Sequence, residues 1–154
     1  MRTRVLHPAR TSHCAHTTTT LLLPWPEDGD AWSCAPCIAA GNIPYHHLVS
    51  LINMRTNSHN LNIERMRHLR PRVPRAQRLC PWCRSPEAVH DELHCVLECP
   101  HVSPVRLQFP ALFAAGGPAD MRTLFTDGSY SCALASFVYR LLRLCDEDRA
   151  RVDN

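Results

Sequence analysis

The chain has 154 residues, with nine cysteines, ten histidines, 13 prolines and a formal net charge of +3 at pH 7. A chain of this length holds one modest domain with irregular ends, and so small a net charge identifies no ligand class by itself. No apolar stretch approaches the roughly 20 residues of a membrane span, so we expect no membrane partner.

The cysteine content bears on the compartment. Nine cysteines without a recognisable secretory signal favour a reducing compartment, the nucleus or the cytoplasm. The apolar run from Leu21 to Leu23 is too short for the core of a signal peptide. The arginines that precede the first acid, Glu27, are a feature of organellar transit peptides, but no amphipathic helix is evident among them.

Residues 1–41 are predicted to form a disordered or loosely structured arm, because prolines and a threonine run break any sustained period. Cys34 and Cys37 form a Cys-x2-Cys pair there, with His46 and His47 downstream. A second metal site is one interpretation of this pair. Incidental thiols are the other, since the fourth ligand is ambiguous.

Residues 42–79 are predicted to form a helical, basic segment that leads to the next cysteines. Pro44 suits the first position of a helix that ends near Arg55. The apolar face of this helix comprises Leu48, Leu51 and Ile52.

A second helical turn is predicted after Ser58, whose hydroxyl is a favourable N-cap. Leu61 and Met66 face the core in this arrangement. Pro71 and Pro74 end the helix and lead the chain, extended, toward the cysteines.

The same segment is strongly basic. Eight arginines and one acid, Glu64, lie between Arg55 and Arg84. Arginine binds phosphate through two nitrogens and stacks on bases, so we expect nucleic-acid contacts from Arg67, Arg70, Arg72, Arg75 and Arg78. The chain contains no lysine, which indicates a coding bias toward arginine. A solvated basic face is therefore the alternative. In it, Arg75, Arg78 or Arg84 offsets the net charge of −1 that three thiolates leave on one divalent ion.

The most informative motif lies in residues 80–101, which we expect to form a zinc module. Cys80, Cys83, His94 and Cys99 form a C-x2-C-x10-H-x4-C array. Two close pairs of such ligands can each hold one edge of a tetrahedral Zn²⁺ ion, so the array predicts a closed Cys3His site. Free thiols, half of a disulfide framework and a redox Cys-x2-Cys are the alternatives, the last normally opening a helix in a βαβ unit.

Residues around the array have more than one interpretation. Trp82, within the Cys-x2-Cys knuckle, either stacks on an unpaired base or packs against Pro81 and Leu79. Cys95 is a competing ligand, but it lies beside His94 and has a poor bite. His90 and His101 are reserve ligands, and the expected small buried hydrophobes are Cys95, Cys132 and Cys145.

The rest of the chain, residues 102–154, is predicted to be a helical C-terminal segment. Before this segment, a short helix from His90 to Leu97 is expected to carry His94. Within the segment, Ser103 is expected to cap a further helix. Asp120 is expected to cap a turn. The clearest helix runs from about Ser129 to Arg149, and its apolar stripe consists of Leu134, Phe137, Val138, Leu141, Leu142 and Cys145. That stripe needs a partner, either the rest of the zinc-stabilised domain itself or another protein.

The flanks of the array carry further motifs over about sixty residues. They are Ser-His-x-Leu-x-Ile-Glu (Ser58 to Glu64), a Pro-Arg segment (Pro71 to Arg75), Cys-x2-Cys (Cys80 to Cys83), Asp-Glu-x-His (Asp91 to His94), Cys-Pro (Cys99 to Pro100), an arginine (Arg106) and Phe-Pro-x-Leu-Phe (Phe109 to Phe113). This set resembles the zinc-binding tail that follows the reverse transcriptase domain of non-LTR retrotransposons and occurs in host genes derived from them. The resemblance implies element RNA or target DNA as ligand.

We expect no enzyme. No Tyr-x-Asp-Asp of a polymerase palm occurs. The nuclease found in some relatives uses paired acids and a lysine, but this chain has no lysine, and only about fifty residues follow Pro100. Glu92 within His90-Asp91-Glu92 matches the H-x-E of zinc deaminases, but their cysteine pair follows that motif and here it precedes it. With four ligands the site is closed, so Glu92 is interpreted as a neighbour of the site or a surface acid.

These observations predict a small mainly-α (α+β) zinc-stabilised domain with a Cys-x2-Cys knuckle and an irregular N-terminal arm. Its expected function is Zn²⁺-dependent binding of RNA or DNA. The alternatives are a structural or protein-interaction module, with a partner on the C-terminal helix, and a decayed element fragment without a selected role.

Overall fold

The structure is a computed structural model that describes residues 42–83, 85–115, 117–118 and 120–152. The expected arm over residues 1–41, and with it Cys34 and Cys37, lies outside this part of the chain. The described part is small and mostly helical. Its one β-bridge, between Leu79 and Val89, is isolated and antiparallel.

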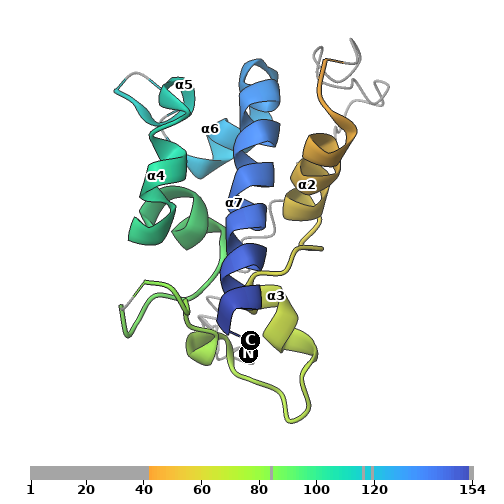
Figure 1. Cartoon of the computed structure of the whole chain (residues 1–154), viewed down its shortest axis with the longest axis vertical. Helices are drawn as coiled ribbons and strands as arrows, with labels where there is room; N and C mark the ends of the chain where they lie inside the picture. The colour runs from red at the N-terminus through yellow and green to blue at the C-terminus, as the bar shows by residue number, and fades with distance from the viewer. Residues whose placement is uncertain (1–41, 84, 116, 119, 153–154) are drawn as a thin grey trace, which may run out of the picture.

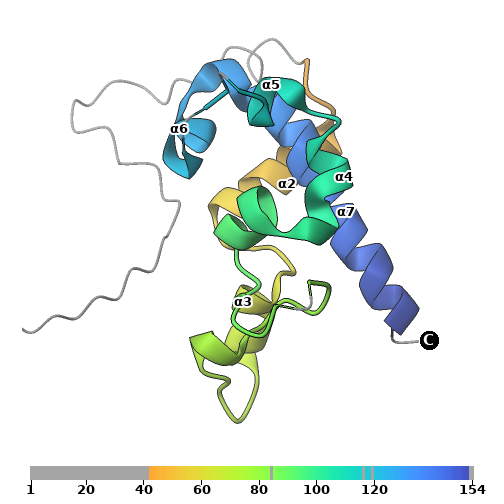
Figure 2. The same ribbon diagram turned by 90° about the vertical axis from the view of Figure 1, so that its left-hand side faces the viewer.

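The long helix α7 (Ser131–Val152) is the axis of the fold. Figure 1 shows α2 (Tyr45–Arg55) along one side of it, and α4 (Ser103–Arg106) and α5 (Pro110–Phe113) along the other. Figure 2, turned by 90°, shows α6 (Met121–Thr126) beside the upper part of the molecule. Contacts of α7 with all four of these helices make it the element around which the core is built.

The stripe predicted for the last helix forms the centre of the core. Its buried members are Leu134, Phe137, Val138, Leu141 and Cys145, whereas Leu142 is half-buried. The rings of Phe109 and Phe113 pack edge-on against Phe137, with centroids 5.6 and 4.7 Å away. The stripe is thus covered by the chain's own elements, which is one of the two partners that the sequence allowed.

The start of α7 differs from the prediction by two residues. Gly128–Tyr130 forms a separate 3-10 turn (η5), because the Asp127 carboxylate accepts a hydrogen bond from the Ser129 N–H at 2.9 Å. The predicted cap at Asp120 is present, since its carboxylate accepts from the Thr123 N–H at 2.7 Å. Asx-type caps of this kind are short-range interactions that a sequence motif identifies well.

Helix α2 begins after Pro44, as the sequence predicts, but its buried face is different. Leu51 and Met54 are fully buried, three residues apart, whereas Ile52 is 48 % exposed. The prediction for Ile52 was wrong because its neighbour Leu51 lies about 100° away around the helix, and the contact with α7 covers only the narrower stripe. His47 reinforces that contact through Nδ1, which lies 3.1 Å from a hydroxyl on α7.

The cap predicted at Ser58 is not formed. Helix α3 (Asn62–Arg65) begins later, after Leu61, and the Ser58 hydroxyl bonds to the Thr56 carbonyl instead. Leu61 is fully buried, as expected, but Met66 is only half-buried because α3 passes at that residue into a 3-10 turn, η1 (Met66–His68).

The segment that leads to the knuckle is not uniformly extended. After η1 it continues through Arg70-Pro71, which is a cis peptide bond, to a further 3-10 turn, η2 (Arg75–Gln77). Leu69 and Pro74 do have extended backbone, in line with the prediction for part of this segment.

The helix predicted from His90 begins two residues later. His90 instead pairs with the chain beside the isolated bridge, since its N–H donates to the Arg78 carbonyl at 2.9 Å. The following turns are η3 (His94–Glu98), which has π-helical geometry, and η4 (Pro100–Val102). Ser103 is the first residue of α4 rather than its cap. No helix in the described part of the chain combines the length and apolar character that crossing a membrane requires.

Candidate metal centre

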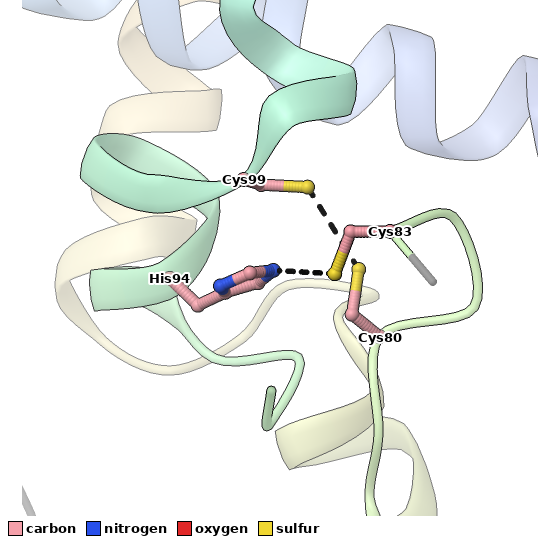
Figure 3. Close-up of side chains that lie close together, drawn as sticks. All are labelled: Cys80, Cys83, His94 and Cys99. Carbon is pink, nitrogen blue, oxygen red and sulfur yellow. Dashed lines mark hydrogen bonds between the residues drawn. The ribbon is translucent and has the colours of Figure 1, made fainter. Parts of the chain in front are cut away.

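The four side chains expected to bind metal lie together. One ligand atom from each of Cys80, Cys83, His94 and Cys99 lies within 4.8 Å of all the others, and every one of these residues is buried. Figure 3 shows the three sulfurs and the imidazole pointing into one common space. The Cys80 and Cys99 Sγ atoms are 3.9 Å apart, and Cys83 Sγ lies 3.1 Å from His94 Nε2. Within the described residues, this is the group that could hold a metal ion.

The first two ligands are positioned by the bridge between Leu79 and Val89. The Cys80 N–H donates to the Ala88 carbonyl at 2.8 Å, which closes the loop that carries Cys83. Asn62 on α3 adds a bond from its side-chain amide to the Leu79 carbonyl at 2.9 Å. The knuckle is therefore held from both sides before any ion is considered.

The other two ligands come from the wide turn η3. The Cys99 N–H donates to the His94 carbonyl, five residues back, at 2.7 Å. This i to i+5 bond is the π-helical pattern, which is rare and occurs mainly as single turns at functional sites. It brings His94 and Cys99 to the same side of the turn, as Figure 3 shows.

Neighbouring acids orient His94. The Asp91 carboxylate accepts from the His94 backbone N–H at 3.0 Å, and the Glu98 carboxylate lies 3.5 Å from Nδ1. A carboxylate beside Nδ1 keeps its proton there and leaves Nε2 free to bind a cation. Asp91 belongs to a motif noted in the sequence, whereas Glu98 was missed, although its place four residues after His94 is a signal for helical pairing.

Arg106 bonds directly to the backbone of this turn. Its guanidinium donates to the carbonyls of Cys95 and Val96 at 3.3 Å and to that of Cys99 at 2.5 Å. The pKa of Arg106 is lowered, because burial outweighs the opposing effect of Cys99 and Cys95. The sequence offered Arg75, Arg78 or Arg84 for the charge that balances the thiolates, and Arg84 lies outside the described residues. Arg106 holds the carbonyl of a ligand residue, so it is better placed than Arg75 or Arg78.

Replacing Arg106 by alanine is expected to lower the free energy of unfolding by about 1.5–3 kcal/mol, the usual range for hydrogen bonds from a charged donor. The carbonyls that end η3 would lose this donor. Urea denaturation followed by circular dichroism measures the change. Arg122→Ala, at an exposed position of α6, is the control, and equal midpoints for the two variants would contradict this role.

The three thiols of the metal group differ in the direction of their pKa shifts. A hydrogen bond to Cys99 and burial raise the pKa of Cys80 to about 12. The same bond lowers the pKa of Cys99, and burial raises that of Cys83. A cation binds thiolates, so its binding releases protons and strengthens as pH rises.

The reserve ligands have other partners. His90 is fully buried, burial lowers its pKa to about 3, and its Nδ1 accepts from the Asn62 N–H at 3.0 Å. His101 Nε2 lies 2.5 Å from a carboxylate oxygen of Asp148 on α7. Cys95 is also outside the metal group, and burial raises the pKa of its thiol.

The remaining predicted residues divide by environment. Trp82 is half-buried against the core, T-shaped to His90 at 4.4 Å and stacked on His101 at 5.9 Å between ring centroids. Its ring packs against the core of the domain and contacts these two histidines. Of the cysteines expected to be buried, Cys95 and Cys145 are, while Cys132 is half-buried.

Glu92 is not a surface acid. It is buried, and its carboxylate lies 2.7 Å from Nε2 of His59, whose side chain has no exposure. His59 lies in the Ser-His-x-Leu stretch singled out in the sequence. Buried charged groups are normally paired, so this contact ties the segment before α3 to the start of the η3 turn.

The arginines of the basic segment also differ. Arg78 is half-buried and donates to the carbonyls of Val73 at 2.9 and 3.1 Å and of Ile63 at 2.6 Å. Arg67 pairs with Glu64 at 3.2 Å and Arg75 with Asp91 at 2.7 Å, with about half of each guanidinium side chain exposed. Arg70 and Arg72 are exposed.

Comparisons with protein-family models, with curated proteins and with solved structures find no match to this chain. The structure defines a small, mostly helical domain with a buried Cys3His group whose ligand atoms are close enough to hold a metal ion.

Proposed function

We propose that the chain is a zinc-stabilised module that binds RNA or DNA and has no polymerase or nuclease activity of its own. The observation that carries the proposal is the convergence of three thiols and one imidazole within 4.8 Å, directly beside an arginine-rich segment. Zinc is a structural component in this account, and the arginines are the ligand-binding groups.

Zinc is the cation that this donor set fits best. Three cysteine sulfurs and one histidine nitrogen are a common structural set for Zn²⁺, with Zn–S distances of about 2.3 Å. In a tetrahedron these distances place two sulfurs about 3.8 Å apart, and Cys80 and Cys99 are 3.9 Å apart. Four protein ligands fill the coordination sphere and leave no position for a reacting water, which supports a structural role.

The arginines support a polyanionic ligand. Arg67, Arg70, Arg72 and Arg75 are exposed within nine residues of chain. Arg75 connects this surface to the metal centre, because its partner Asp91 also accepts from the His94 N–H. Metal binding would thus keep the arginine-bearing segment in place.

The sequence resemblance described above supports an origin in a retrotransposon reverse transcriptase tail. Some of its motif residues have clear roles in the fold. His59 pairs with Glu92, and Arg106 donates to the carbonyl of Cys99, the residue that follows η3. Phe109 and Phe113 pack on Phe137 of α7. These motif residues therefore have structural roles that do not depend on catalysis.

Binding to RNA or DNA is expected to weaken steeply with salt. If the four exposed arginines each contact one phosphate, the logarithm of the affinity falls with the logarithm of salt concentration, with a slope of about −2.8 for single strands and about −3.6 for duplex DNA. Fluorescence anisotropy with labelled single-stranded and duplex oligonucleotides at several salt concentrations measures the slope. Absence of binding to all of them, or a flat salt response, would contradict the proposal.

A purely structural role is the second candidate, and the internal contacts of the arginines favour it. Arg78 is used by backbone carbonyls, and Arg67 and Arg75 each have an acidic partner. In that case the metal and the arginines only stabilise the domain. Arg70→Ala and Arg72→Ala would then leave nucleic-acid binding at the level of the unchanged protein.

A further inference from the structure

The loop between η1 and η2, residues 69–74, is an exposed and basic part of the described chain. We call it the arginine loop. Figures 1 and 2 show the yellow-green segment that follows α3 protruding from the lower end of the molecule in both views. Every residue of the loop except the half-buried Val73 is exposed, including Leu69, at 49 %. The loop contains two arginines, two prolines and no acid.

The two arginines of this loop differ from the arginines that flank it. Arg67, Arg75 and Arg78 all bond to carboxylates or carbonyls. For Arg70 and Arg72, no hydrogen bond or ion pair is found with any residue that the structure describes. Their guanidinium groups are therefore available, and the five N–H donors of each can be satisfied by a ligand.

The base of the loop is held firmly. Arg78 donates twice to the Val73 carbonyl, at 2.9 and 3.1 Å, and once to the Ile63 carbonyl at 2.6 Å. Pro71 and Pro74 restrict the backbone further, because the proline ring fixes φ. The backbone that presents the two arginines is therefore pre-organised, so that little backbone entropy is lost when the loop binds a ligand.

We propose that the arginine loop inserts Arg70 and Arg72 into the minor groove of A·T-rich duplex DNA. This inference rests on the proposed nucleic-acid function and names the ligand class. The minor groove is about 6 Å wide, too narrow for a helix of about 10–12 Å but wide enough for arginine side chains presented by a loop. A-tracts narrow it further and concentrate negative potential, which attracts arginine.

Other nucleic acids offer the loop less. In a G·C-rich duplex the guanine amino group projects into the minor groove as a donor, facing a side chain that has donors only. In A-form RNA the minor groove is wide and shallow and lacks the narrow negative channel. The loop has the donors and the shape for the A·T minor groove, whose base edges present acceptors only.

The test compares the affinity of the full chain, loaded with zinc, for three duplexes of equal length at one salt concentration near 0.15 M. They are A·T-rich DNA, G·C-rich DNA and an RNA duplex of matched sequence. We expect binding to the A·T-rich DNA to be about tenfold tighter, which corresponds to about 1.4 kcal/mol. Netropsin, which occupies the A·T minor groove, should displace the protein.

Variants connect the preference to the loop. The double variant Arg70→Ala, Arg72→Ala should lose the A·T preference, and circular dichroism should confirm that it folds, because both side chains are exposed. Arg122→Ala with Arg151→Ala, at exposed positions of α6 and α7, removes the same charge elsewhere and should keep the preference.

The outcomes separate the inference from the function on which it rests. Equal affinity for the three duplexes, tighter binding to RNA, or an unchanged preference in the loop variant would overturn the minor-groove inference and leave nucleic-acid binding intact. Absence of binding to every duplex and every single strand would overturn both.

Discussion

Removal of the metal is expected to unfold the domain. Structural zinc contributes an apparent free energy of about 10–16 kcal/mol, comparable to the whole stability of a small domain, about 5–15 kcal/mol. A strong chelator, or the substitution Cys80→Ser, should therefore abolish the cooperative thermal transition and most of the helical signal. An ion bound by both Cys80 and Cys99 would join the knuckle to the end of η3, where otherwise thiol contacts and core packing connect the two turns. Circular dichroism with thermal melting measures both effects.

The control for this experiment is Cys132→Ser. Cys132 is a half-buried cysteine near the start of α7 and is not part of the metal group. It should keep the transition, and it should lose that transition when the chelator is added. A spectrum and melting temperature that are unchanged in the chelator and in Cys80→Ser would contradict an organising metal.

Phe137→Ala is expected to lower the free energy of unfolding by about 3–5 kcal/mol. Phe137 is fully buried in α7, and Phe109 and Phe113 both pack edge-on against its ring. Its removal leaves a cavity at the junction of α7 with α5, which these short helices cannot easily close. Urea denaturation of the zinc-loaded protein measures the loss.

The matched control for Phe137→Ala is Leu107→Ala. Leu107 follows α4 directly and is 82 % exposed, so its removal should change the free energy of unfolding by less than about 0.5 kcal/mol. Equal effects of the two substitutions would show that α7 is not the centre of the core.

The metal group was predictable because its signal is local. A Cys-x2-Cys pair and a His-x4-Cys pair each lie within one turn of chain, so spacing alone restricts where the ligands can lie. The stripe of α7 was predictable for the same reason, since it repeats over several turns with the period of a helix. Asp120 was identified because a cap needs only the three residues that follow it.

The features that the sequence did not predict depend on long-range contacts. Arg106 acts through the carbonyls of η3, and the π-helical form of that turn follows from bringing His94 and Cys99 together. Met54 replaces Ile52 in the core because α7 covers only one side of α2. A sequence pattern describes one helix or turn at a time, whereas each of these features depends on contacts between elements.

The arginine segment shows the same distinction. Composition identified it as basic, but only the fold separates Arg78, which bonds to backbone carbonyls, from Arg70 and Arg72, which are exposed. The carbonyls that bind Arg78 lie five and fifteen residues before it. Their position relative to its side chain depends on how the loop closes.

The central claim is that one zinc ion is bound by three sulfurs and one imidazole nitrogen. Native mass spectrometry of the purified chain, with elemental analysis of the same sample, tests it most directly. The account predicts one zinc ion per chain, lost in His94→Ala and kept in His101→Ala, whose imidazole faces Asp148 instead. A chain that folds without bound metal, or that keeps its zinc after His94→Ala and Cys99→Ser together, would contradict it.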